Sequence, residues 1–458
     1  MKRIVILGGG FGGLYAAVEL DRILKRRKDL EVILVNRENF FLFTPMLHEV
    51  AASDLDLTTI VSPLRKLLKR VTLFTGMCEA VDLERQTVRL WHGDDQHPHE
   101  IEFDHVILGL GSTTNFFSLP GLAENALTMK SLGDAIRLRN RVIANLEEAD
   151  FECCAPLRRR LLTVVVAGGG FAGVETAAAL HDFAHAALPH YNNLTADQLR
   201  VVIVHSGKTI LPELGAKLGD YAARKLTQRG VEILTGVRVT AYEDGLVHLS
   251  DGSAIESHTL VWTAGTAPNP LVHTLPCSME RGRVCVTESL QANGWDNVWA
   301  VGDCALVPDP STGEYHPPTA QHAIRQGKVC ARNVVAAIDG KTAKPFRFRS
   351  LGQLASLGRR TGVANIMGIN FSGFFAWWLW RTIYLLKLPR FEKKVRAAID
   401  WTLDLFFSKD IVQFQTSLAP TFSTSRPPGV INGDACDLPV VHAPRPDEER
   451  GAMVLDRS

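Results

Sequence analysis

Residues 4–19 read IVILGGGFGGLYAAVE, and this stretch decides the fold of the chain. Its first four residues form an unbroken apolar run, which is typical of a strand buried on both faces of a parallel sheet. Gly8, Gly10 and Gly13 follow with the spacing G-x-G-x-x-G, and small and apolar residues then open a helix. The first glycine permits the tight turn, the second lets the backbone approach a pyrophosphate, and the third brings the helix against the strand. Because residues 32–35 supply a second strand, we interpret the stretch as a dinucleotide-binding unit rather than a glycine-rich surface turn.

The end of that second strand departs from the usual pattern. A carboxylate that binds the ribose is expected there, but Asn36 occupies the position and Glu38 is the nearest acid. Since an amide can also hydrogen-bond a hydroxyl, we predict that Asn36 or Glu38 binds the ribose. Residues 103–108 form another buried-strand pattern that ends near Gly111, and a glycine at such a strand end permits close approach by a cofactor.

The opening pattern then recurs about 160 residues later. Residues 162–167 form a strand, Gly168, Gly170 and Gly173 repeat the spacing, a helix follows, and residues 200–204 supply the second strand. A duplicated motif is far more specific than one copy. It predicts two bound dinucleotides, or one bound across two halves. His205 replaces the expected acid, and the strand at 259–262 ends near Gly265.

A third informative segment is VWAVGD at residues 298–303. Here a strand delivers Asp303 through a turn at Gly302, so that the carboxylate can bind cofactor hydroxyls; a turn or cap residue is the alternative. Ala320 and Gln321 then begin a helix that runs to about residue 338. The positive N-terminal end of this helix suits electron-rich ring oxygens, although Gln321 also fits as an ordinary polar residue of a first turn.

Bulk properties narrow the class of protein. A net charge of +1 gives no electrostatic argument for nucleic-acid binding, and eight cysteines without a C-x-x-C pair indicate free thiols in a reducing compartment. We expect no signal peptide, because a strand begins directly after Met1, and no spanning helix, because charges interrupt every window of about 20 residues. Residues 39–49 are apolar but contain Pro45, and they predict either a wall for a flat ligand or a plain core loop.

The C-terminal part is unusually aromatic. Residues 371–407 hold 11 of the 35 aromatic residues, and Pro389 divides them into two expected helices. Six basic residues are interleaved with the aromatic ones: Arg381, Lys387, Arg390, Lys393, Lys394 and Arg396. Such a mixture predicts a helix pair at a lipid headgroup boundary. The alternative is that these aromatic residues close a dimer interface or pack onto the core, although a dimer interface would be expected to lack charge. The proline-rich, polar residues 416–458 predict a disordered tail.

Together these motifs resemble the flavin-dependent two-dinucleotide oxidoreductases, and within them the type II NADH dehydrogenases, which are non-proton-pumping NADH:quinone oxidoreductases. The similarity covers about residues 1–410. It implies that FAD binds at Gly8, Gly10 and Gly13, with a second FAD fingerprint at Gly302 and Asp303, and that NAD(P)H binds at Gly168, Gly170 and Gly173. It also implies that Ala320 and Gln321 lie beside the flavin ring and quinone, and that Glu175 lies close to the nicotinamide and flavin.

The resemblance implies an α/β fold with two Rossmann-like domains and a C-terminal helical membrane-anchoring segment. We expect the FAD domain at 1–150 and 281–345, the NAD(P)H domain at 155–280, the anchor at 346–415 and the tail at 416–458. The implied activity is FAD-dependent electron transfer from NADH to a membrane quinone. The protein would be peripheral, on the anionic cytoplasmic face of the plasma membrane, with a homodimer as an open alternative.

Two departures from the family pattern matter. The usual quinone motif is A-Q-x-A-x-Q, but Arg325 occupies its final position and Gln326 comes one place later. One residue turns a helical side chain by about 100°, so Gln326 cannot simply substitute. His205 stands where NADH-preferring members carry an acid, which leaves NADH and NADPH both open. Glu175 also has a structural explanation, because the dipole stabilises an acid in the first turn of a helix.

Three alternatives of function remain at this point. A sulfide:quinone oxidoreductase needs a redox cysteine pair beside the flavin, and the only plausible positions, Cys153, Cys154 and Cys330, adjoin no flavin-contact segment. A disulfide reductase needs a C-x-x-C or similar pair after the first helix, which the sequence lacks. A flavin-binding redox sensor, with no enzymatic turnover, is the third.

Overall fold

A computed structural model describes residues 1–93 and 95–414, so the predicted disorder of 416–458 lies outside the described residues. Its frame is a pair of five-stranded parallel sheets. The first has the order β22 (Val298–Ala300), β9 (His105–Leu108), β1 (Lys2–Leu7), β2 (Leu30–Asn36) and β5 (Thr72–Thr75). The second has the order β11 (Leu127–Thr128), β18 (Thr259–Trp262), β12 (Thr163–Ala167), β13 (Arg200–His205) and β14 (Val231–Thr235).

The two glycine motifs form the predicted strand–turn–helix units. Ile4 pairs with Val32 across β1 and β2, and the turn after β1 leads into helix α1 (Phe11–Ile23). Gly8 has a φ of +98°, which only glycine adopts freely, and a Cβ on Gly13 would lie 1.9 Å from the Gly8 carbonyl oxygen. The second unit repeats this geometry before helix α7 (Phe171–Ala187). The first and third glycines are therefore required by the backbone itself.

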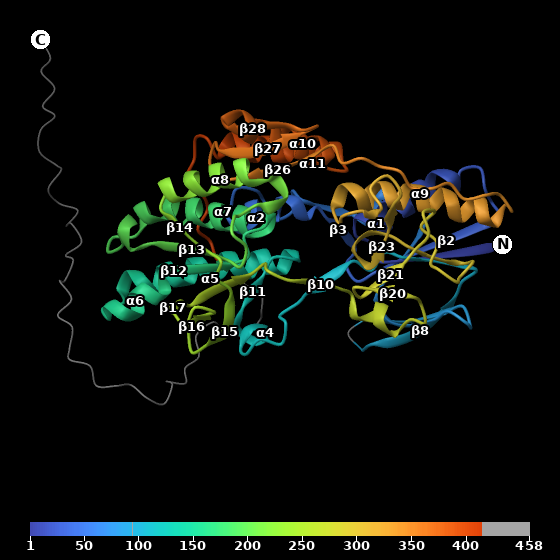
Figure 1. Cartoon of the computed structure of the whole chain (residues 1–458), viewed down its shortest axis with the longest axis horizontal. Helices are drawn as coiled ribbons and strands as arrows, with labels where there is room; N and C mark the ends of the chain where they lie inside the picture. The colour runs from blue at the N-terminus through green and yellow to red at the C-terminus, as the bar shows by residue number, and fades with distance from the viewer. Residues whose placement is uncertain (94, 415–458) are drawn as a thin grey trace, which may run out of the picture.

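The first sheet is completed from a distant part of the chain. β22 joins its edge beside β9, and helix α9 (Ala320–Ile338) returns to pack along α1 (Figure 1). A Cβ on Gly327 of α9 would lie 2.2 Å from the Gly12 carbonyl oxygen, so the two helix backbones approach very closely. Residues 298–338 thus lie with the first sheet.

The border between the two units differs from the expected position at residue 150. Two short antiparallel strands, β10 (Ser112–Thr114) and β19 (Thr266–Pro268), connect the units. Beyond them, β11 already pairs with β18 of the second sheet. Helix α5 (Leu132–Phe151) also belongs there, because the Asn145 amide donates to Thr259 Oγ1 at 3.0 Å. The chain therefore enters the second unit soon after Thr114, earlier than the expected residue 150.

Residues 352–403 form a separate layer over α7 and α8 (Ala216–Gln228) (Figure 1). The sequence predicts its two helices, α10 (Phe374–Lys387) and α11 (Phe391–Leu403), which separate around Pro389 as expected. It does not predict the antiparallel sheet of β26 (Gly352–Ser356), β27 (Gly362–Ile366) and β28 (Ile369–Gly373) that precedes them. Within the described residues, every helix is too short or too polar to cross a membrane.

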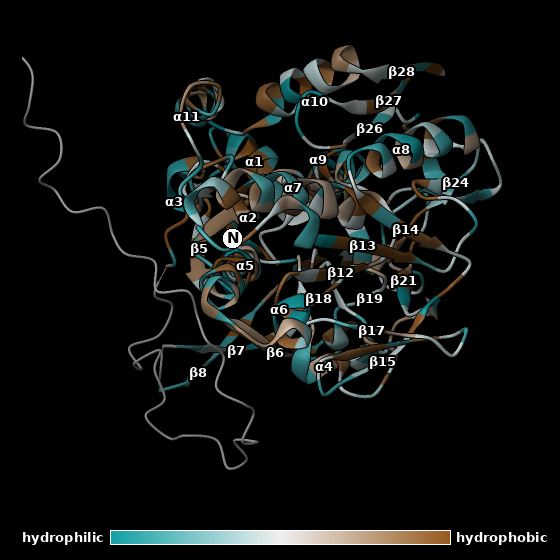
Figure 2. Ribbon diagram, turned by 90° about the vertical axis from the view of Figure 1, so that its left-hand side faces the viewer, coloured by the Kyte–Doolittle hydropathy of each residue, from teal (hydrophilic) through white to brown (hydrophobic). Residues whose placement is uncertain are grey.

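The expected role of the basic residues in this layer needs correction. Lys393 is buried and bonds to the Thr58 carbonyl, and the Arg381 guanidinium lies 4.3 Å from the Trp377 ring centre and 4.7 Å from that of Trp401. Lys393 and Arg381 are thus held inside the protein, so not all six charges are available to a membrane. Hydrophilic and hydrophobic residues are mixed along α10 and α11 (Figure 2), and some of the apolar ones are exposed. We call its exposed apolar members the apolar face: Phe374, Phe375, Trp378, Leu386, Phe391, Val395, Ile399 and Leu403.

Candidate functional site

A cavity of about 580 Å³ opens between the two units, at the carboxyl ends of β1, β9, β18 and β22. This is the edge at which open parallel sheets bind ligands. The structure brings eight of the predicted site residues to its wall: Gly10, Gly111, Glu175, Gly265, Gly302, Asp303, Ala320 and Gln321. Residues from both glycine-rich units thus face one shared space.

The second glycine of each motif leaves room for a ligand. A Cβ built on Gly10 or on Gly170 meets no atom within 4 Å, in contrast to the crowded neighbours in the same turns. Each turn also places a helix N-terminus, with its free N–H groups, at this opening, as anionic phosphates require. Both loops therefore fit a pyrophosphate. Gly265 differs, because a Cβ there would lie 2.5 Å from the Asn115 carbonyl oxygen, so its small size serves protein packing.

Asn36 and His205 occupy equivalent positions and bind the glycine loops themselves. Asn36 Oδ1 accepts from the Gly9 N–H at 2.7 Å, and its Nδ2 donates to the Glu38 carbonyl at 2.7 Å. His205 Nδ1 accepts from the Gly169 N–H at 3.1 Å. These side chains hold the loops in shape, which sequence reasoning did not foresee. Their contact with a ribose, and that of the exposed Glu38 side chain, stays a prediction.

Asp303 belongs to a small polar group in the cavity. Its Oδ2 accepts from Ser112 Oγ at 2.7 Å, and Ser112 Oγ in turn accepts from Lys130 Nζ at 2.9 Å. Burial lowers the pKa of Lys130, and the Asp303 charge opposes that shift. Ser112 and Lys130 come from β10 and the loop before α5, far from Asp303 in sequence. Only folding reveals this group, which offers both donors and acceptors to a ligand's hydroxyls.

The start of α9 forms another part of the wall. Gln321 Nε2 donates to Ser350 Oγ at 2.8 Å, and Arg325 lies with its guanidinium 4.0 Å from the Phe348 ring centre. Arg325 faces the cavity, whereas Gln326 is buried and accepts from the Gly302 N–H at 2.9 Å. The predicted turn of about 100° between neighbouring helical residues is thus realised. Gln326 holds the Gly302 turn and does not reach the cavity.

Glu175 is buried between α7 and the C-terminal layer. Its Oε1 accepts from the Ser356 N–H at 3.0 Å and from Trp380 Nε1 at 2.9 Å. Burial raises the pKa of Glu175 to about 8, against the opposing effect of these two donors. The acid is the fifth residue of α7 rather than a first-turn residue, so the dipole explanation is wrong. A carboxyl group whose pKa lies close to neutral pH can donate a proton and be reprotonated.

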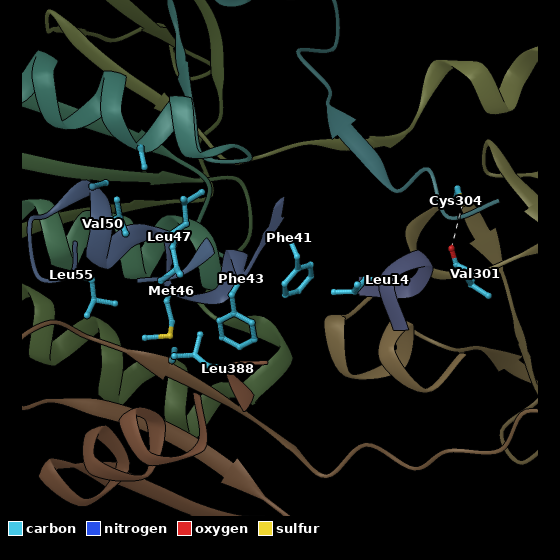
Figure 3. Packing of buried hydrophobic residues seen from close by; sticks show 14 of the residues in the cluster. Leu14, Phe41, Phe43, Met46, Leu47, Val50, Leu55, Val301, Cys304 and Leu388 are labelled. Carbon is cyan, nitrogen blue, oxygen red and sulfur yellow. Dashed lines mark hydrogen bonds between the residues drawn. The ribbon is translucent and has the colours of Figure 1, made fainter. Parts of the chain in front are cut away.

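Residues 39–49 and helix α10 supply a further part of the wall. Phe43, Thr44, Pro45, Leu47 and His48 line the cavity, while Phe41 and Met46 of the same segment pack into the core (Figure 3). The two interpretations of residues 39–49 are therefore both partly right. From α10, Tyr384 and Lys387 reach the same wall, and the Tyr384 ring centre lies 6.0 Å from that of Phe43. Their long sequence separation hid this arrangement.

The cysteines do not form a redox centre in this cavity. Its wall, as far as the structure describes the chain, contains no cysteine. Cys330 is buried in α9, and Cys304 is buried with its thiol donating to the Leu108 carbonyl at 3.3 Å. Burial raises the pKa of Cys304 to about 11, which disfavours the reactive thiolate.

Comparisons with known proteins agree with this geometry. The model of the pyridine nucleotide-disulphide oxidoreductase family matches residues 2–327, and that of the NDH2 C-terminal domain matches residues 351–410. The type II NADH:quinone oxidoreductase Ndh of Mycobacterium tuberculosis is 34% identical, with 88% of this chain and 87% of that protein covered. Demethylphylloquinone reductase NdbB of Synechocystis is 31% identical, covering 87% and 95%. The structure of NDH2 from Plasmodium falciparum in complex with NADH has the same fold, with a TM-score of 0.83 at 19% identity over 90% of this chain and 99% of that one.

Proposed function

Because this chain belongs to the pyridine nucleotide-disulphide oxidoreductases, and within them to the type II NADH:quinone oxidoreductases, we propose that it passes electrons from NADH through FAD to a quinone. The observation that carries the proposal is the shared cavity, which joins both glycine-rich units, the start of α9 and a protonatable glutamate. Its wall lacks the cysteine pair that the sulfide:quinone alternative needs, again within the described residues.

FAD would be held by the residues of the first unit. The Gly10 loop and the N-terminus of α1 suit its pyrophosphate, and the group of Asp303, Ser112 and Lys130 suits its hydroxyls. The N-terminus of α9 at Ala320 lies ready for an electron-rich ring. When bound, FAD supplies the hydride acceptance and electron transfer, while the protein positions the reactants and excludes water.

The nicotinamide nucleotide would bind at the Gly170 loop, beside Glu175. His205 Nδ1 accepts a hydrogen bond from Gly169, so the neutral ring carries its proton on Nε2, where it can donate. A donor at this position tolerates the 2′-phosphate of NADPH, whereas an acid would repel it. We therefore propose that both NADH and NADPH are oxidised. Two potato relatives carry the name NAD(P)H-ubiquinone oxidoreductase, which supports this.

The quinone would enter beside α9 and α10. Gln321, Arg325, Tyr384 and Lys387 offer polar and aromatic contacts in this part of the wall. The apolar face lies on the same two C-terminal helices, where its exposed side chains could enter the lipid boundary. Peripheral attachment to the cytoplasmic face of the plasma membrane follows as part of the proposal. A homodimer covering the apolar face is the alternative.

One anaerobic titration tests the activity. The purified protein should be yellow, should bleach when NADH or NADPH is added, and should regain its colour when a soluble quinone follows. Protein that takes up no FAD, or flavin that neither nucleotide reduces, would overturn the proposal; the second result would favour a redox sensor. Sedimentation with anionic vesicles tests attachment separately, and a dimer in solution that ignores vesicles would contradict it.

A further inference from the structure

A second cavity, of about 280 Å³, lies behind Glu175, and we propose that it conducts the proton that quinone reduction takes from solution. This inference rests on the proposed function. The overall reaction is NADH + H⁺ + quinone → NAD⁺ + quinol, so two electrons and one proton arrive with the hydride and one further proton must come from water. Once flavin and quinone fill the main cavity, that proton needs another path.

His48 is the link between the two spaces, because it lines both cavities. Its Nδ1 lies 3.8 Å from Glu175 Oε2, and its Nε2 is buried with no hydrogen-bond partner among the described residues. The first distance is too long for a hydrogen bond, yet a small rotation or one water would close it. A neutral imidazole donates from one nitrogen and accepts at the other, so it can pass a proton through.

Most residues that line the second cavity are charged or titratable, and the others include Ala179, Ala186 and Trp377. The acids are Glu49, Asp54, Asp182 and Asp404, and the bases are His185, Arg359, Arg381 and Lys409. These charged side chains and this volume suit several ordered waters. Arg359 is exposed to solvent, so the cavity reaches the surface at its rim. Asp54 pairs with Lys409 at 2.5 Å, which leaves Glu49 to carry the proton. Glu49 follows His48 on helix α2 (Leu47–Ala51), where neighbouring side chains point about 100° apart, so waters in the cavity that both residues line must connect them.

Burial raises the pKa of both carboxyl groups that flank His48 on the proposed path, those of Glu49 and Glu175. Glu49 Oε2 accepts from Trp401 Nε1 at 2.9 Å, and burial raises its pKa to about 8, as it does for Glu175. Arg381 and Lys409 favour the charged form of Glu49, and Asp54 disfavours it. Two acids of similar pKa can exchange a proton near neutral pH without a net cost.

His48 itself must carry the proton only briefly. Burial lowers its pKa to about 3, so protonating it from an acid near 8 is unfavourable by about 10⁵. The ring therefore rests neutral, with one nitrogen able to donate and the other to accept. The path runs from solvent to Glu49, through His48 to Glu175, and on to the quinone oxygen.

The test uses the full-length flavoprotein, reduced by NADH and mixed rapidly with a short-chain quinone. Flavin absorbance follows reoxidation, and a pH-indicator dye follows proton uptake. His48→Leu and Glu49→Gln should each slow both signals together by at least about ten-fold, with a larger solvent deuterium effect. Reduction of the flavin by NADH should keep its wild-type rate.

His185→Gln is the matched control, because His185 lines the same cavity but bonds through Nδ1 to the His181 carbonyl at 2.9 Å. It should behave as wild type. Wild-type reoxidation and proton uptake in both test variants would overturn the route. If His48→Leu fails to hold flavin, Glu49→Gln decides the question alone. Failure of quinone to reoxidise the wild-type flavin would instead refute the proposed function.

Discussion

Replacing Glu175 by glutamine should change how the stability of the protein depends on pH. The residue is 7% exposed, and burial raises the pKa of its carboxyl from 4.5 to about 8. In the unfolded chain the carboxyl loses its proton above pH 4.5, while in the folded protein it keeps that proton until about pH 8. The folded state therefore loses stability as the pH rises through this window, and no such loss occurs below pH 4.5. Glutamine keeps the shape and cannot ionise.

The size of the effect follows from the two pKa values. A shift of about 3.5 units corresponds to about 5 kcal/mol at full ionisation, since each unit is about 1.4 kcal/mol. Between pH 5 and pH 8 the linkage relation gives a loss of about 3.5 kcal/mol in the wild type. Glu175→Gln abolishes this loss, so the free energy of unfolding of the variant should increase relative to that of the wild type as the pH rises.

Urea unfolding of the flavoprotein at pH 5, 6.5 and 8 measures this gain. With a slope of about 3 kcal/mol per molar urea, the midpoint difference between Glu175→Gln and wild type should widen by about 1 M across that range. Glu124→Gln, at an exposed position of helix α4 (Leu122–Asn125), is the control and should show a constant difference. A constant difference for Glu175→Gln as well would refute the reasoning that this carboxyl is held protonated by burial.

Three further predictions concern the nucleotide sites, the membrane and the acid's surroundings. Gly10→Val should abolish FAD binding, seen as a colourless protein, whereas Gly170→Val should stay yellow but resist reduction by NADH; identical behaviour would contradict the assignment of the two sites. Val395→Asp combined with Ile399→Asp should lower binding to anionic vesicles by about 100-fold, because burying each apolar side chain contributes about 1.5–3 kcal/mol. Turnover of a soluble quinone should not slow. Unchanged sedimentation with vesicles would favour a dimer interface. Trp380→Phe removes a hydrogen-bond donor from the Glu175 carboxyl and should move the pH profile of quinone reduction to higher pH. An unchanged profile would show that this hydrogen bond does not influence the reaction.

The membrane prediction uses point substitutions because the C-terminal layer is part of the core. Trp380 is fully buried, and Trp401 is 7% exposed and donates to Glu49. Truncation near residue 350 would remove these contacts together with β26, which packs on α7. Loss of activity after truncation would then report a damaged core rather than a lost anchor.

The sequence by itself determined those features that depend on neighbours along the chain. The turns at Gly8 and Gly168 follow from backbone sterics, and the parallel strands follow from apolar runs buried on both faces. Likewise, the rotation between Arg325 and Gln326 follows from helix geometry alone. Each of these features depends on residues only a few positions apart, and the covalent chain fixes that spacing.

Only the tertiary structure decided which distant side chains meet. Trp380 reaches Glu175 across 205 positions, His48 lies between two cavities, and Asn36 fastens its loop although its type suggested a ribose contact. The basic residues near the aromatic helices looked free, yet Lys393 is buried. The physical reason is that burial and hydrogen-bond satisfaction depend on which surfaces pack together. A linear pattern gives the type of each side chain but not its partner, and the partner sets its pKa and its role.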